Sequence, residues 1–231
     1  MKKYYDLLSL NPLFLHISKE DYPQMLSCLG AFTRSYGRKE EILSAGEPAR
    51  FIGIVLSGSV QIVSTDVFGN QTIFGIMEPP ELFAEAFCCA GTEHLPVTVL
   101  SVSESTILFL DGKKIFTSCK QSCPFHRLLT EQMVRVLAER NIMLNQKLRF
   151  LSRRSTREKL LDYLSFMSRQ SASLSFSIPF DRQGLADYLC VDRSAMSAEL
   201  SRMQKEGLLS FRKNHFRLNA DEHPDIHRES E

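Results

Sequence analysis

The most regular alternation of apolar and polar positions lies between residues 180 and 218. Apolar residues at helical spacing predict one helix over 182–189 and a second helix that begins after Asp192. Gly207 is placed to end the second helix, and two short strand patterns, 208–211 and 216–218, follow it. This order of elements predicts a helix–turn–helix followed by a small β-wing.

The chain before residue 111 carries a different pattern. Short apolar runs are separated by Gly, Pro, Asn and Asp residues, which is typical of strands joined by tight turns. The expected strands include 51–56, 60–64, 71–77, 97–102 and 106–110. Several short strands at regular spacing predict an antiparallel β-barrel or jelly roll. We assign residues 1–123 to this first domain.

A long helical pattern connects the two regions. Leu129, Val136, Met143 and Phe150 recur every seven residues, which favours a helix that pairs with a partner helix in a homodimer. The alternative is a helix that packs on its own barrel. The chain is thus expected to be an α+β protein with a long dimerisation helix and hinge over 124–151, a winged helix–turn–helix domain over 152–219 and an acidic tail over 220–231.

The charge distribution separates the halves of the 231-residue chain. The formal net charge is only +1, yet residues 147–219 hold 14 Lys and Arg against 7 Asp and Glu. A basic domain beside a slightly acidic one indicates a nucleic-acid partner. No apolar run approaches a membrane span, and the amino terminus lacks the pattern of a signal peptide. We therefore expect a cytoplasmic protein with no membrane partner.

The second helix of the helix–turn–helix supplies the candidate DNA contacts. Its amino-terminal turns are polar, and a helix in the major groove reads bases with such residues. We expect Arg193, Ser194 and Ser197 to read bases. Phosphate or groove-edge contacts are expected from Arg182, Gln183, Arg202 and Lys213. The alternative is a solvated helical hairpin on an enzyme. His94 is the one histidine between residues 32 and 110, however, and no catalytic motif is present, so we expect no enzyme.

Six stretches carry a resemblance to a known family. They are Gly46-Glu47, 54–60, 83–85, 182–189, 192–197 and 206–209. Together with the order of barrel, long helix and winged helix–turn–helix, they resemble the Crp/Fnr family of bacterial transcription regulators. The resemblance implies a cyclic-nucleotide-binding-like barrel that senses a small-molecule effector. It also implies a homodimer on a palindromic operator in double-stranded DNA, with RNA polymerase as a further partner. Many relatives carry an Arg where Ala198 stands.

The sequence departs from the family where cyclic AMP binds. Relatives that bind it carry a Gly-Glu pair and, about ten residues later, an Arg that neutralises the phosphate. Here Ala84-Glu85 replaces the first pair, and no Arg or Lys lies between Arg50 and Lys113. A buried phosphate without a cation is strongly disfavoured, so we expect no tight cyclic-nucleotide binding and identify no cofactor. The candidate effector-pocket residues are Glu85, Ala86, Phe87, Val97, Thr98 and Met133.

Cysteines and histidines leave redox, metal and haem sensing open as alternatives. Only Cys28 lies in the first 80 residues, so the iron–sulfur cluster of some relatives is not expected. Cys88-Cys89 and the Cys119/Cys123 pair are weak signals for thiol or metal chemistry. Candidate haem ligands are His16, His94 and His126. A functional alternative is a receptor for a small molecule, for haem or for a redox signal that no longer regulates DNA.

Overall fold

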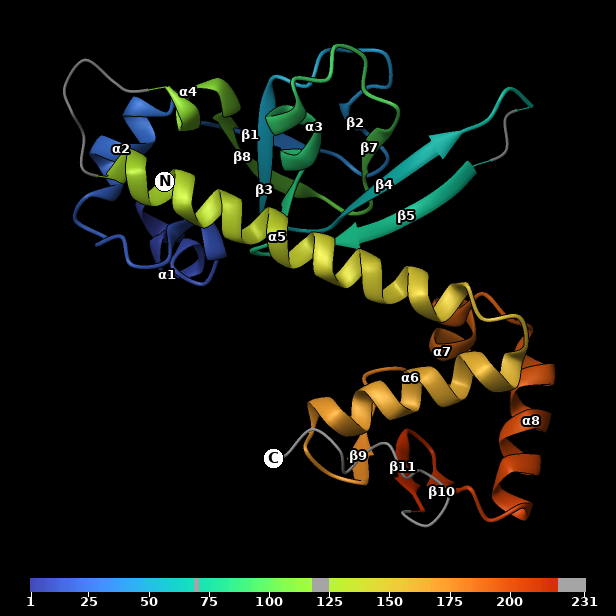
Figure 1. The fold of residues 1–231 in the computed structure, drawn as a ribbon. Helices are drawn as coiled ribbons and strands as arrows, with labels where there is room; N and C mark the ends of the chain where they lie inside the picture. Colours follow the sequence, from blue (N-terminus) through green and yellow to red (C-terminus); the bar gives the residue numbers. More distant parts are fainter. Residues whose placement is uncertain (69–70, 118–124, 220–231) are drawn as a thin grey trace. The chain divides into compact units, whose positions relative to one another are not determined.

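The structure is a computed structural model that describes residues 1–68, 71–117 and 125–219 (Figure 1). Cys119, Cys123 and the acidic tail 220–231 lie outside the described residues. The chain divides into two compact units, Met1–Glu139 and Arg140–Glu231. The boundary between them falls within one long helix, which the sequence analysis had treated as a segment of its own.

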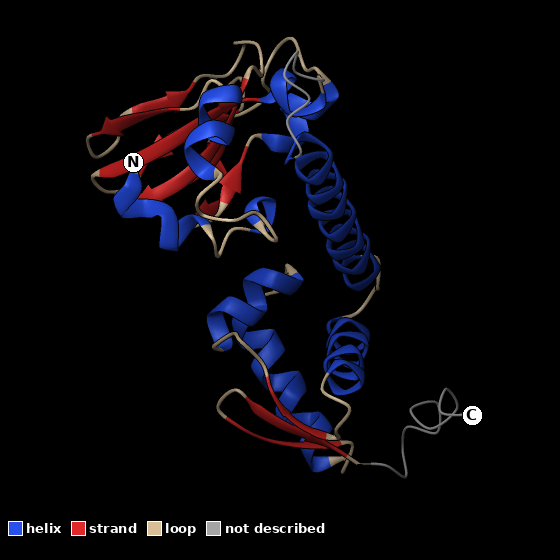
Figure 2. Ribbon diagram, turned by 90° about the vertical axis from the view of Figure 1, so that its left-hand side faces the viewer, coloured by secondary structure: helices blue, strands red, loops and turns tan. Residues whose placement is uncertain are grey.

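The first unit contains two antiparallel four-stranded sheets, in the orders β1-β8-β3-β6 and β2-β7-β4-β5 (Figure 2). Their bounds are β1 Phe32–Tyr36, β2 Glu41–Leu43, β3 Phe51–Ser57, β4 Val60–Thr65, β5 Gln71–Met77, β6 Leu82–Phe83, β7 Thr98–Ser101 and β8 Ser105–Asp111. The helical segments of this unit are η1 Lys2–Tyr4, α1 Tyr5–Leu8, η2 Pro12–Phe14, α2 Tyr22–Cys28, α3 Glu85–Ala90 and α4 Gly112–Phe116. The predicted antiparallel jelly roll is confirmed.

Alternation along β3 explains why residues 51–56 are apolar throughout. Ile52 and Ile54 belong to a core that also contains residues of α2, while Val55 belongs to a second core that joins strands of both sheets. Successive strand side chains point to opposite faces, so both faces of β3 are buried. Gly53 is required in this strand, because a Cβ there would lie 2.1 Å from the ring of Phe83.

The connecting helix is α5, Phe125–Leu151, close to its predicted limits. Its first half packs on its own unit: Leu129, Met133 and Val136 are buried in the core that contains α2. This is the arrangement that the sequence analysis gave as the alternative to dimer pairing. Among the helices that the structure describes, α5 included, none combines the length and apolar character needed to cross a membrane.

The second unit packs three helices on a three-stranded sheet of order β10-β11-β9. Its elements are α6 Thr156–Gln170, β9 Ser175–Ser177, α7 Arg182–Leu189, α8 Arg193–Lys205, β10 Leu209–Arg212 and β11 His215–Leu218. The strand β9 was not among the predicted strands, because it lies in the serine-rich stretch 168–177, which shows no strand pattern. Phe176 is the residue that anchors it, since it is 4% exposed and stacks on Phe216.

Candidate nucleic-acid interface

Two capped helices form the helix–turn–helix as expected. The carboxylate of Asp181 accepts a hydrogen bond from the backbone N–H of Gly184 at 2.7 Å, which satisfies a free donor at the start of α7. The chain leaves α7 through Cys190, whose φ of 50° is left-handed. Asp192 then caps α8 by accepting from the N–H of Ala195 at 2.8 Å. Its pKa is lowered, first by the hydroxyl of Ser194 and then by this N–H.

The two faces of α8 have opposite character. Met196, Leu200 and Met203 are fully buried and hold the helix against its own unit. Arg193 and Ser194 are exposed in the first turn. Ser197 is half-buried, and its hydroxyl donates to the backbone carbonyl of Arg193 at 2.9 Å. The helix therefore presents a polar amino-terminal surface, which is what a major groove requires.

The residues expected to contact phosphate differ in how free their side chains are. Lys213 is exposed in the turn of the wing. The guanidinium of Arg202 binds Glu199 at 3.0 Å, with two thirds of the side chain exposed. Gln183 donates to Asp187 at 2.8 Å. Arg202 and Gln183 can therefore reach a phosphate only if they give up or share these bonds, whereas no such exchange is described for Lys213.

Arg182 has a structural contact that the sequence analysis did not foresee. Its guanidinium lies 4.6 Å from the ring centroid of Phe211 and 5.2 Å from that of Phe216. Burial lowers the pKa of Arg182. A cation over aromatic faces is stabilised by their negative π-clouds, so this side chain joins α7 to the wing. Its expected phosphate contact stays a prediction.

Sequence reasoning also missed Arg157, which precedes the helix–turn–helix by 25 positions. Its guanidinium binds Glu199 at 3.3 Å and a second carboxylate, Glu206, so that α6 is tied to the middle of α8 and to the residue that follows its end. The available signal was the seven-residue spacing of the two glutamates, because residues two helical turns apart lie on the same side of a helix. In the wing, His215 contacts the hydroxyls of Ser175 and Ser177, each at 3.1 Å.

The candidate effector residues of the first unit occupy unlike environments. Glu85 is 1% exposed in the first turn of α3, and Met133 is fully buried in the core. Val97 is buried, Thr98 and Phe87 are half-buried, and Ala86 is exposed. Their assignment to an effector pocket stays a prediction.

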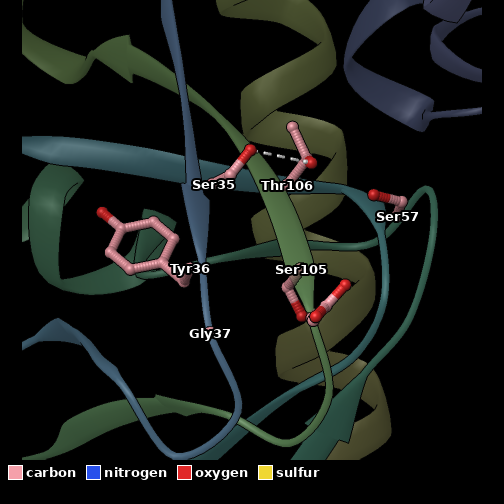
Figure 3. A pocket seen from close by; sticks show the side chains of 7 residues that line it. Ser35, Tyr36, Gly37, Ser57, Ser105 and Thr106 are labelled. Carbon is pink, nitrogen blue, oxygen red and sulfur yellow. Dashed lines mark hydrogen bonds between the residues drawn. The ribbon is translucent and has the colours of Figure 1, made fainter.

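A cavity of about 400 Å³ does open elsewhere in this unit, where β1 and β3 end and β8 begins. Its lining residues are Ser35, Tyr36, Gly37, Ser57, Glu104, Ser105 and Thr106 (Figure 3). Three of the lining hydroxyls already have partners: Ser35 contacts Thr106 at 3.3 Å, and Ser105 donates to the carbonyl of Ser59. Gly58 is required beside it, since its φ is +79° and a Cβ would lie 2.3 Å from Glu104 O.

The described histidines and cysteines are not gathered into a metal site. Within the described ranges, no group of three or more His, Cys, Asp or Glu side chains could hold a metal. His94 contacts the carbonyl of Gly46 at 2.9 Å, and His126 lies 3.7 Å from Cys28. Burial raises the pKa of Cys88 and raises that of Cys89 to about 11.

Comparison with known proteins agrees with these two units. A family model described as a cyclic nucleotide-binding domain matches residues 33–122, and one described as a Crp-like helix-turn-helix domain matches residues 158–221. The transcriptional activator protein FnrL of Cereibacter sphaeroides is 23% identical over 190 residues, which cover 78% of this chain and 73% of that protein.

Two solved structures share the fold over most of the chain. The catabolite activator protein of Thermus thermophilus matches with a TM-score of 0.53 and 21% identity, covering 93% of this chain and 97% of that one. The c-di-GMP-responsive global regulator CLP of Xanthomonas campestris matches with a TM-score of 0.54 and 17% identity, covering 88% and 100%. A barrel joined to a winged helix–turn–helix defines a transcription regulator of the DNA-binding class. The chain belongs to the Crp/Fnr family of such regulators.

Proposed function

We propose that this protein is a homodimeric, sequence-specific regulator that binds a palindromic operator and responds to an effector other than cyclic AMP. The observation that carries the proposal is the contrast between the buried apolar face and the exposed polar face of α8. Three of its apolar side chains are fully buried, while Arg193 and Ser194 stand exposed in its first turn beside a basic wing. A regulator of this kind acts in the cytoplasm and meets RNA polymerase at its promoters.

We propose a dimer surface that differs from the stripe expected from the sequence. Leu129 and Val136 are buried in the first unit and Phe150 is buried in the second, so these three side chains already have partners in their own chain. Met143, the fourth, is 66% exposed. The apolar side chains that α5 leaves exposed in the second unit also include Ile142, Leu144 and Leu148. Leu144 and Leu148, one turn apart, with Asn141 before them, provide a surface for a second copy of the helix.

Selection from a random DNA library tests the proposal. The full-length protein should enrich one palindrome whose half-sites are about one helical turn apart, because two α8 helices of a dimer meet successive major-groove faces. A matched selection with Arg193→Ala should enrich a more degenerate sequence. If neither protein enriches any sequence, the chain is a receptor without operator recognition, and the proposal is wrong.

A further inference from the structure

The three-stranded sheet of the wing has an exposed face to which no DNA contact has yet been assigned. Side chains alternate along its strands, so Phe176 and Phe216 lie in the core and their neighbours face the solvent. Strand pairing sets the exposed side chains in two rows, Ser177, His215 and Arg212 in one and Ser175, Arg217 and Ser210 in the other. The strands β9, β10 and β11 contain no Asp or Glu, so this face is polar and basic.

An imidazole lies between two hydroxyls on this face. The Nδ1 of His215 lies 3.1 Å from the Oγ of Ser177, and its Nε2 lies 3.1 Å from the Oγ of Ser175. The contacts join positions 38 and 40 residues apart in the sequence, so the pairing of β9 with β11 creates them. Because both ring nitrogens have a hydroxyl partner, the protonation state of the ring decides what the two hydroxyls can donate.

The two protonation states leave different groups free. A neutral imidazole has one nitrogen that donates and one that accepts, so one serine must give its only proton to the ring. An imidazolium donates from both nitrogens, so both serines accept from it and each keeps its O–H for another partner. Protonation of His215 therefore adds a positive charge to the face and frees a second hydroxyl donor beside it.

We propose that this face of the wing binds a phosphodiester of the DNA backbone, and that it does so with His215 protonated. A phosphodiester is an anion whose free oxygens accept hydrogen bonds and donate none, so it matches two serine O–H groups above an imidazolium. The site rests on the DNA binding proposed above. It does not rest on a palindromic operator, because backbone contacts carry no sequence information.

The charges around the ring couple its proton to the anion. Arg212 pairs with His215 across the strands, Arg217 follows two residues later on the same face, and Lys213 lies in the turn between β10 and β11. Three cations disfavour a fourth, and a bound phosphate offsets that repulsion. Proton and phosphate should therefore each strengthen the binding of the other. Since histidine side chains change charge between about pH 5 and 8, DNA affinity should rise as the pH falls through that range.

Titration of a random-sequence duplex with the full-length protein, at constant ionic strength, tests the site. The protein should bind at least ~5-fold more tightly at about pH 6 than at about pH 8. His215→Gln keeps a hydrogen-bonding side chain without the charge, so it should remove most of that gain and bind as the wild type does at the higher pH. The double variant His223→Gln, His227→Gln changes two other histidines and should keep the gain. No gain in the wild type, or an equal gain in His215→Gln with an unchanged melting curve, would overturn the proposal.

The hydroxyls are tested in the same titration. Ser175→Ala with Ser177→Ala removes both donors beside the ring and should reduce the gain at low pH. Ser210→Ala removes a hydroxyl of the same face that is not one of the two ring partners, so it should keep the gain in full. An equal gain in both variants would show that the hydroxyls take no part and would overturn the site as described.

A direct readout of the ring separates this site from the proposed function. In protein with labelled histidine at neutral pH, added duplex should move the His215 resonance towards the imidazolium position, and His215→Gln identifies that signal. A resonance that does not move would overturn the proposal. If the resonance moves but library selection enriches no operator, the site stands and the sequence-specific function is wrong. An enriched operator whose pH dependence is the same in His215→Gln would overturn the site alone.

Discussion

Arg157 on α6 binds Glu199 on α8 through a guanidinium–carboxylate contact of 3.3 Å. The same guanidinium binds Glu206, just beyond the end of α8, and this bond raises the pKa of Arg157 while it lowers the pKa of Glu206. Glu199 in turn binds Arg202. The helix that should enter the groove is therefore positioned by a charge network as well as by its apolar face.

The first prediction concerns this network. Arg157→Ala should lower the free energy of unfolding by about 1 kcal/mol, because the pair is partly exposed and solvent screens it. It should also weaken operator binding, since α8 loses a contact that fixes its orientation. Arg154→Ala removes the same charge three residues earlier and serves as the control. Denaturant titration and DNA titration on both variants decide the matter, and equal effects would contradict a positioning role.

The second prediction is a dependence of stability on acid. The bond from Arg157 lowers the folded-state pKa of Glu206 below its ordinary 4.5. A carboxyl of this kind stabilises the folded state above its unfolded pKa, and that contribution is lost as the pH falls through the lower folded value. Glu206→Gln should therefore reduce stability at neutral pH and flatten the loss of stability below about pH 4.5. Melting temperatures of the wild type and of Glu206→Gln, measured from neutral to acid pH, test this. If the two proteins lose stability equally as the pH falls, the prediction is wrong.

The third prediction assigns roles on α8. Arg193→Ala should cost about 1–3 kcal/mol of specific binding if the side chain makes a bidentate base contact. Arg202→Ala should weaken all DNA sequences alike and reduce the salt slope by about one, because a phosphate contact releases counterions whatever the sequence. Titrations of operator and random DNA at several salt concentrations measure both. Equal losses on the two DNAs for both variants would contradict the assignment.

Periodicity predicted the second unit well because its helices carry their own local signals. Asp181 and Asp192 stand directly before the two helices and cap them, and Met196, Leu200 and Met203 are buried as helical spacing requires. Long-range contacts gave no such signal. Arg182 lies on Phe211 only because the wing folds back on α7, and nothing in the local sequence shows it.

Local sequence also could not show what covers the apolar stripe of α5. Seven-residue spacing identifies a face of a helix but not the surface that covers it. Leu129 and Val136 share that face and are covered by the first unit itself. The contact between Cys28 and His126, 98 residues apart, was also beyond the reach of periodicity.

The fourth prediction concerns cyclic AMP. No Arg or Lys lies between Arg50 and Lys113, and Arg50 itself binds Asp111 at 3.5 Å. A buried cyclic phosphate would lack a cation there. Millimolar cyclic AMP should therefore change neither the melting temperature nor the operator affinity. A ligand at 100 times its dissociation constant adds about 2.7 kcal/mol to stability, so binding would be visible. A saturable shift would show that another group supplies the charge.

The last prediction links the dimer to recognition. Leu144 and Leu148 are 63% and 62% exposed, four residues apart on one side of α5. Met143 is equally exposed at 66%, but it shares the seven-residue stripe of the buried Phe150 and so faces another direction.

A charge buried at a helix pair without a partner is costly, so Leu144→Glu with Leu148→Glu should give a folded monomer. Met143→Glu should stay dimeric. The monomer should lose most operator-specific binding, since a single α8 offers few base contacts, yet keep weak non-specific binding through the untouched basic surface. Sedimentation and DNA titration on the same samples test this. A double variant that stays dimeric would place the interface elsewhere, and a monomer with full operator affinity would show that recognition does not need two copies.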